Sequence, residues 1–213
     1  VQCTEDQTEL LGARIGLIDG ETYESLVNQT ADCIPAANSH RVAYKAPVLL
    51  MAPRFVHAIG YGAVPDRYTV EFELPDGELL AREFVVKEDH DWGLHVLNQL
   101  DDVPMSLYPQ PHESGAPYWW TYEEENRILY LQYNAVQTHD DYPFEQMVEE
   151  LLAKIDEGGV QAVVVDVRYS GGGHNALIDP LEDGLSSRFR QGELDHLYVL
   201  ISGRSFSSAV DVA

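Results

Sequence analysis

Residues 197–213 read LYVLISGRSFSSAVDVA, and this stretch decides how the rest of the chain is interpreted. Its first five residues form a continuous apolar run, which predicts a strand buried on both faces. Ser202, Gly203 and Arg204 break the run, and a serine-rich segment then leads into small residues that can open a helix. A strand, a tight turn and a helix in this order commonly expose a serine nucleophile, with helix N–H groups beside the developing oxyanion. The alternative is that these serines only cap the helix.

The preceding residues alternate between strand and helix patterns. Strands are expected at residues 118–122, 128–134 and 160–167, and helices at 143–157 and 175–184. This order predicts an α/β fold with a mainly parallel sheet and flanking helices, preceded by a smaller mixed α+β N-terminal region. Ligands of such sheets bind at the carboxyl ends of strands. The glycines at 171–173 and the serines at 205–208 both fall at such ends.

The first half of the chain predicts smaller elements. Its expected elements are a strand ending in an Asp-Gly turn at residues 11–20, a helix at 22–30, short helical or strand pieces at 46–59, a hairpin at 68–86 and a helix at 92–100. We therefore divide the chain into a partial accessory region (1–60), a hairpin and connector (61–117) and a core (118–213) that looks incomplete at its C-terminus.

Composition limits the partners. The chain has 36 acidic and 13 basic residues and a net charge of −23, which argues against binding nucleic acid or an anionic membrane surface. No apolar run approaches the roughly eighteen residues of a membrane span, and we expect an extracytoplasmic or secreted protein. Cys3 and Cys33 lack metal-site spacing and form either one disulfide or two free thiols. The histidines show no HExxH pattern, so neither a metal nor another cofactor is expected. The sequence carries no signal of oligomeric state.

Two segments resemble one family. Residues 163–173, VVVDVRYSGGG, resemble the strand and loop signature of the S41 serine peptidases, the C-terminal processing or tail-specific protease group. Residues 203–209, GRSFSSA, resemble the nucleophile turn of the same family. The resemblance implies a ClpP/crotonase-like ββα core and a serine endopeptidase acting on a peptide or protein substrate. It also implies that residues 1–60 form part of a PDZ-like or cap module.

The same resemblance assigns the site residues. Ser207 matches the nucleophile, the backbone N–H of Ser208 one oxyanion donor, and the N–H of Gly172 the other, with the two flanking glycines as alternatives. A glycine loop suits this role because bare N–H groups approach a substrate oxygen without a Cβ in the way. The glycines alone also fit a plain turn or an anion-binding nest. Asp166 and Arg168 are expected to orient the loop through charge-assisted hydrogen bonds.

The sequence departs from the family pattern at the general base. S41 enzymes use a lysine downstream of the nucleophile, whereas this sequence ends at Ala213. Lys45 and Lys87 lie in the wrong region and Lys154 on the outer face of its helix. An unactivated serine is a poor nucleophile. We therefore expect a fragment whose base lies beyond the C-terminus, or else an inactive, peptide-binding relative.

Three further alternatives stay open. His174 or His139 offers a different base for a Ser-His arrangement. A crotonase-like oxyanion loop polarising an acyl-CoA is a second chemistry, although the acidic charge disfavours a phosphate-rich ligand. The aromatic residues of 118–122 either line a peptide groove or, as we expect, pack in the core.

Overall fold

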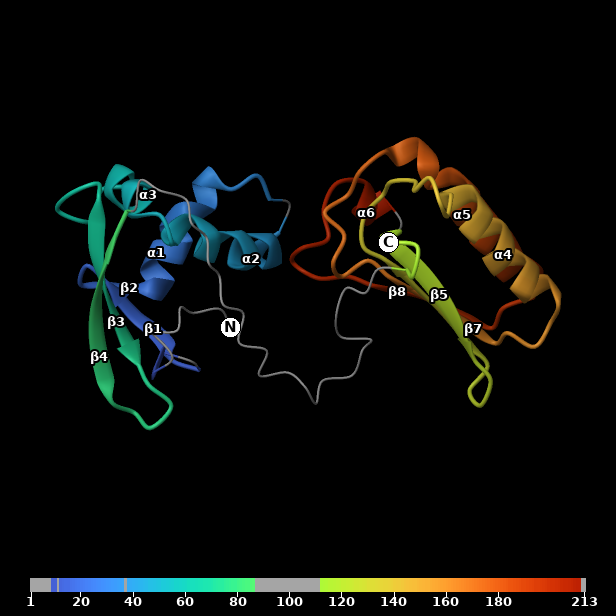
Figure 1. Ribbon diagram of the computed structural model, residues 1–213, viewed down its shortest axis with the longest axis horizontal. Coiled ribbons are helices and arrows are strands. Elements are labelled where there is room, and N and C mark those ends of the chain that lie inside the picture. The colour runs from blue at the N-terminus through green and yellow to red at the C-terminus, as the bar shows by residue number, and fades with distance from the viewer. Residues whose placement is uncertain (1–8, 11, 37, 87–111, 212–213) are drawn as a thin grey trace. The chain divides into compact units, whose positions relative to one another are not determined.

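The computed structural model describes residues 9–10, 12–36, 38–86 and 112–211 (Figure 1). The chain divides into two compact units, Val1–Val103 and Pro104–Ala213. Each unit has its own four-stranded sheet and its own hydrophobic core. The three-part division with boundaries after residues 60 and 117 stays a prediction.

The first unit holds an antiparallel sheet with the strand order β2-β1-β3-β4. The strands are β1 (Arg14–Ile18), β2 (Glu21–Thr22), β3 (Arg67–Glu73) and β4 (Leu79–Val85). The helices are α1 (Tyr23–Thr30), the 3-10 turn η2 (Ala31–Cys33), α2 (Ser39–Leu50) and α3 (Pro53–Ala58). Thr22 caps α1, since its hydroxyl accepts a hydrogen bond from the Ser25 N–H at 3.2 Å.

These elements confirm the expected strand, helix and hairpin of the first half. Residues 46–59, which the sequence left between helix and strand, are mostly helical. The helix expected at residues 92–100 lies outside the described residues. Cys33 is exposed and is a free thiol, and Cys3 also lies outside the described residues.

The second unit is an α/β layer structure with the strand order β5-β6-β7-β8. Its strands are β5 (Tyr118–Glu123), β6 (Ile128–Tyr133), β7 (Ala162–Asp166) and β8 (His196–Leu200). Its helices are α4 (Phe144–Asp156), the 3-10 turn η4 (Asn175–Leu177), α5 (Asp179–Gln191) and α6 (Ser208–Asp211). β5 pairs antiparallel with β6, whereas β6, β7 and β8 are parallel, so the sheet is mixed.

Helices α4 and α5 lie side by side on one face of this sheet (Figure 1). Both connect parallel neighbours, and right-handed crossovers place successive helices on the same face. The α4 side chains in the core are those at helical spacing: Phe144, Met147, Val148, Leu151 and Ile155. Apolar periodicity therefore predicted this helix and its buried face correctly.

The end of α5 was predicted wrongly. We expected the helix to stop near Gly184, but it continues to Gln191 and ends at Gly192, which has a φ of 76°. A Cβ at Gly184 would stand 2.5 Å from Leu152 Cδ1. The glycine thus marks the close approach of α5 to α4 and not a helix end.

The predicted burial of residues 197–201 on both faces is also wrong. Leu197 and Val199 pack against the core, whereas Tyr198 is 51% exposed and Ile201 is 61% exposed. Tyr198 alternates to the sheet face opposite Leu197 and Val199, whereas Ile201 lies just past the end of β8. In the part of the chain that the structure describes, β8 is also the last strand of its sheet.

The aromatic residues of β5 pack, as expected. Tyr118 is fully buried, and Trp120 and Tyr122 lie against the same core. Trp119 points to the other face, where its ring lies 5.4 Å from that of Tyr130. Among the described helices, none is long and apolar enough to cross a membrane.

Candidate active site

The glycine loop after β7 and the serine turn after β8 lie together at one edge of the sheet. β7 and β8 are parallel neighbours, so their carboxyl ends meet there. Several hydrogen bonds join the two segments. Among them, the Ser202 hydroxyl donates to the Arg168 carbonyl (2.5 Å), the Ser205 hydroxyl to the Val167 carbonyl (2.8 Å), and the Phe206 N–H to the Ser170 carbonyl (3.3 Å). The serine turn is therefore fixed to the end of β7 by side chains as well as by backbone.

Gly172 comes into direct contact with this turn. A Cβ built on Gly172 would stand 2.7 Å from the Ser207 Cβ and 2.6 Å from the Phe206 carbonyl oxygen. Gly172 also has a φ of 95°, a conformation that other residues rarely adopt. Only glycine fits here, and its backbone reaches the immediate surroundings of Ser207.

Ser207 itself has an unusual backbone. Its φ is 55°, in the left-handed region, which costs a non-glycine residue on the order of 1 kcal/mol or more. Asp19 and Arg127 are the other non-glycine residues with positive φ in the described part of the chain. Ser207 is exposed, whereas Ser208 beside it is fully buried. A strained, exposed serine at a turn into a helix has the geometry of a nucleophile elbow.

The backbone N–H groups assigned to the oxyanion hole lie close together. The Ser208 nitrogen is 3.2 Å from the position that a Cβ on Gly172 would take, so the Ser208 N–H lies beside the backbone of Gly172. The Gly172 N–H has a partner of its own, since it donates to the Ser170 hydroxyl at 3.3 Å. That bond is long, and an oxyanion would be a stronger acceptor for the same N–H.

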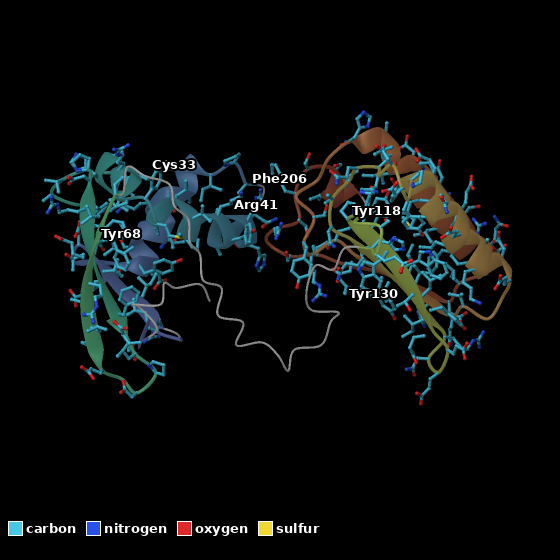
Figure 2. The ribbon with its side chains drawn as sticks, viewed as in Figure 1. Cys33, Arg41, Tyr68, Tyr118, Tyr130 and Phe206 are labelled. Carbon is cyan, nitrogen blue, oxygen red and sulfur yellow. The ribbon has the colours of Figure 1, made fainter. Side chains whose placement is uncertain are left out.

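Asp166 and Arg168 form an ion pair at the start of the segment that leads to the glycine loop, with Asp166 fully buried. The Arg168 guanidinium donates to the Asp166 carboxylate at 2.6, 2.9 and 3.1 Å, and the Arg168 backbone N–H adds a further bond at 3.0 Å. Tyr130 on β6 (labelled in Figure 2) donates its hydroxyl to the same carboxylate at 2.5 Å. The expected orienting contact between Asp166 and Arg168 is present, whereas Tyr130 was missed. Its signal in the sequence was a polar side chain on the strand next to Asp166.

These contacts set the charges of the cluster. Burial raises the pKa of the Asp166 carboxyl, but hydrogen bonds from Arg168 and Tyr130 outweigh burial and hold that pKa below its ordinary value. Burial, together with the hydrogen bond to Asp166, raises the pKa of the Tyr130 hydroxyl to about 12. The hydrogen bond with Asp166 also raises the pKa of Arg168. At neutral pH the cluster is an ion pair with a neutral tyrosine, which suits a structural role.

No base reaches Ser207 within the described residues, where its hydroxyl has no hydrogen-bond partner. Lys154 binds Glu157 at 2.9 Å and lies 4.8 Å from the centre of the Tyr122 ring. Tyr122 stands near the amino ends of the parallel strands, opposite the edge that carries Ser207. Lys154 is therefore not the base of this site.

The two histidines make contacts of other kinds. His139 Nδ1 accepts a bond from the Asp141 N–H at 3.3 Å. The His174 side chain is exposed, and the backbone N–H of His174 donates to the Val136 carbonyl at 2.8 Å. Neither ring forms a hydrogen bond to Ser207.

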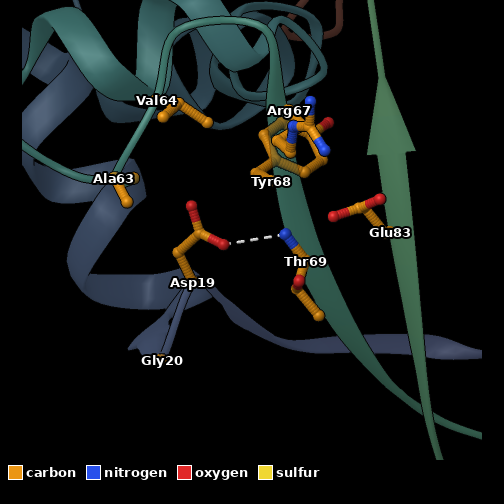
Figure 3. A pocket seen from close by; sticks show the side chains of 9 residues that line it. Asp19, Gly20, Ala63, Val64, Arg67, Tyr68, Thr69 and Glu83 are labelled. Carbon is orange, nitrogen blue, oxygen red and sulfur yellow. Dashed lines mark hydrogen bonds between the residues drawn. The ribbon is translucent and has the colours of Figure 1, made fainter.

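The first unit contains a cavity of its own. It has a volume of about 510 Å³ and is bordered by Asp19, Gly62, Arg67, Tyr68 and Glu83, among others (Figure 3). One oxygen of the Asp19 carboxylate accepts a hydrogen bond from the Thr69 N–H at 2.7 Å. None of the predicted site residues borders this cavity. We place the candidate site at Ser207, because the strained serine and the glycine contact are there.

In the described ranges, no group of three or more His, Cys, Asp or Glu side chains is placed so that it could hold a metal ion. The absence of a cofactor stays a prediction. The structure thus brings Ser207, Ser208 and Gly172 together, and their chemical roles stay predictions as well.

Comparison with known proteins adds little to this geometry. No protein-family model matches the sequence. No curated protein matches it either. Among solved structures, the fold is similar to that of mature CPAF complexed with lactacystin, with 12% sequence identity and a TM-score of 0.47. The likeness covers 80% of this chain and 38% of that one, so the chain spans less than half the length of that structure. A likeness at this level does not establish a common family.

Proposed function

We propose that the chain carries the nucleophile and oxyanion hole of a serine endopeptidase of the S41 type, built on a ClpP/crotonase-like core. One observation carries the proposal: Gly172 and Ser207 are in contact so close that no side chain fits between them. An oxyanion hole needs backbone N–H groups beside the nucleophile and open to a substrate oxygen. The exposed, left-handed Ser207 supports the same assignment.

In the proposed reaction, the Ser207 oxygen attacks the carbonyl carbon of a peptide bond while a general base takes the hydroxyl proton. The N–H groups of Ser208 and Gly172 donate to the negatively charged oxygen of the tetrahedral intermediate. The C–N bond then breaks, the amine leaves with the proton from the base, and an ester to Ser207 remains. Water hydrolyses the ester and restores the serine.

The base is expected from a part of the protein beyond the described residues, as a lysine in the S41 manner. A peptide or protein is the proposed substrate, and the net charge of −23 leaves nucleic acid outside the proposed partners. An extracytoplasmic or secreted location belongs to the same proposal.

The test is covalent labelling of the full-length protein with a fluorophosphonate probe, followed by mapping of the labelled residue. We expect label on Ser207, and hydrolysis of an unfolded peptide that Ser207→Ala abolishes. Ser186→Ala on α5 serves as the control, since Ser186 lies far along the chain from the turn and binds only its own helix. Hydrolysis at the unsubstituted rate by the Ser207→Ala protein would refute the proposal.

A second candidate is an inactive relative that binds extended peptides. The observation in its favour is the Ser207 hydroxyl, which lacks a hydrogen-bond partner among the described residues. This candidate predicts no fluorophosphonate label and equal peptide affinity for the unsubstituted and Ser207→Ala proteins.

A further inference from the structure

We infer that the Ser208 side chain is a positioning residue, which holds the glycine loop against Ser207 and so shapes the oxyanion hole. The inference rests on the proposed function. It concerns the hydroxyl of Ser208, whereas the proposed oxyanion donor is the backbone N–H of the same residue. Neither the family resemblance nor the sequence pattern assigns the hydroxyl a role.

The contact that carries the inference is short and buried. The Ser208 Oγ accepts a hydrogen bond from the Gly173 N–H at 2.7 Å. Ser208 is 0% exposed, so water does not offer the Gly173 N–H an equivalent partner there. We call this hydrogen bond the loop latch.

The loop is held on its other side by Val136. A Cβ on Gly173 would lie 1.9 Å from the Val136 carbonyl oxygen, and the Val136 N–H donates to the Gly172 carbonyl at 3.2 Å. The glycine loop therefore runs between Val136 and the turn that carries the nucleophile. On the nucleophile side, the loop latch is the shortest hydrogen bond that these glycines make.

The latch acts on the peptide unit next to the proposed donor. Gly172 and Gly173 are adjacent, so fixing the Gly173 N–H restricts the direction of the Gly172 N–H. The Gly172 N–H otherwise has only the long 3.3 Å bond to the Ser170 hydroxyl. Without the latch, the loop can turn this N–H away from Ser207. A misplacement of about 1 Å at a reacting centre costs on the order of 100-fold in rate.

Helix capping is the ordinary alternative for a serine at the start of a helix. A capping hydroxyl accepts from an N–H of its own helix, but the Ser208 hydroxyl accepts from Gly173 on another segment. The two N–H groups that follow Ser208 in α6 have other acceptors, since Ala209 donates to the Phe206 carbonyl and Val210 to the Ser207 carbonyl. The contact between segments therefore distinguishes this serine from a cap.

The test uses the full-length protein and two readouts. The first is amide hydrogen exchange at Gly173, measured by NMR, which reports the latch whether or not the protein is a peptidase. The second is the rate of fluorophosphonate labelling at Ser207. For Ser208→Ala we expect exchange at Gly173 to rise by about tenfold or more and labelling to slow by about 10- to 100-fold. Affinity for an unfolded peptide should stay unchanged.

Ser205→Ala is the matched control. The Ser205 hydroxyl anchors the same turn to Val167 but does not touch the glycines, so exchange at Gly173 should stay as in the unsubstituted protein. If Ser208→Ala does not fold, Ser208→Cys leaves no cavity, being slightly larger than serine, and replaces the hydroxyl by a weaker acceptor.

Each outcome decides the inference. Unchanged exchange at Gly173 in Ser208→Ala overturns the latch. Faster exchange with an unchanged labelling rate overturns its role in positioning. Absence of label from the unsubstituted protein overturns the proposed function, and the positioning role with it, while the exchange experiment still decides whether the latch exists.

Discussion

Gly172 and Ser207 are so close that one added carbon atom on the glycine would stand 2.7 Å from the serine Cβ. They come from segments that follow different strands, and they meet because those strands are parallel neighbours. The contact therefore depends on the sheet, on the two connections and on the absence of a side chain at Gly172. It is the part of the structure on which the functional proposal depends most.

Gly172→Ala is expected to impair the site severely. The methyl group would overlap the Phe206 carbonyl and the Ser207 side chain, and alanine at a φ of 95° is strained. We expect labelling of Ser207 to slow by about 100-fold or more, and the free energy of unfolding to fall by about 1–3 kcal/mol. Gly171→Ala is the control, because a Cβ there meets nothing within 4 Å. Equal labelling rates for the two variants would contradict the proposed site.

Ser207→Gly is expected to stabilise the protein while abolishing labelling. Glycine adopts a φ of 55° without the strain that serine bears there, so we expect unfolding to cost about 0.5–1 kcal/mol more. Ser207→Ala also removes the hydroxyl but keeps the strain, and it should give no such gain. Denaturant unfolding of the three proteins measures the difference. A Ser207→Gly protein no more stable than Ser207→Ala would show that the left-handed backbone carries no cost.

The sequence was sufficient for the features that depend on local periodicity. The apolar spacing of α4 predicted its buried face, and the alternating strand and helix patterns predicted parallel neighbours whose ends meet. The approach of the glycine loop to the serine turn followed from that topology.

Other features depend on residues that are distant in the sequence and pack against them in the fold. Gly184 suggested a helix end because the sequence does not show Leu152 on the facing helix. The apolar run at 197–201 suggested burial on both faces, but exposure depends on which layers cover the strand. The hydrogen bonds that the Ser170 and Ser208 hydroxyls accept from the glycine loop could not be predicted from the sequence. A serine hydroxyl can donate, accept or cap a helix, and only the fold selects its partner.

Tyr130→Phe is expected to lower the free energy of unfolding near neutral pH. The substitution should also make that free energy fall less steeply as the pH is lowered. The substitution removes a hydrogen bond to the buried, charged Asp166, which contributes about 2 kcal/mol. The pKa of Asp166 is lowered in the folded state, so its stabilising contribution is present above the ordinary value near pH 4 and is lost as the pH falls through the lowered pKa. Without the tyrosine hydroxyl that pKa rises toward its ordinary value.

Unfolding free energies of both proteins between pH 7 and lower values check this prediction. The deficit of Tyr130→Phe should shrink as the pH falls from about 4 through the lowered pKa of Asp166, below which the carboxyl is protonated in both folded proteins. Tyr198→Phe is the control, since Tyr198 is 51% exposed on β8 and makes no hydrogen bond through its hydroxyl to a described residue. A deficit that stays constant with pH would separate the tyrosine from the charge of Asp166.

The packing of α5 on α4 predicts coupling between Gly184 and Leu152. Alanine at Gly184 gains about 1 kcal/mol in helix propensity, but its Cβ would stand 2.5 Å from Leu152 Cδ1, so the leucine has to move. We therefore expect Gly184→Ala to change stability little in the unsubstituted protein, because crowding offsets the gain. In a Leu152→Ala background the crowding is gone, and the same substitution should stabilise by about 1 kcal/mol. A double-mutant cycle by denaturant unfolding measures this coupling. An equal effect of Gly184→Ala in both backgrounds would mean that the glycine is not required by the approach of the two helices.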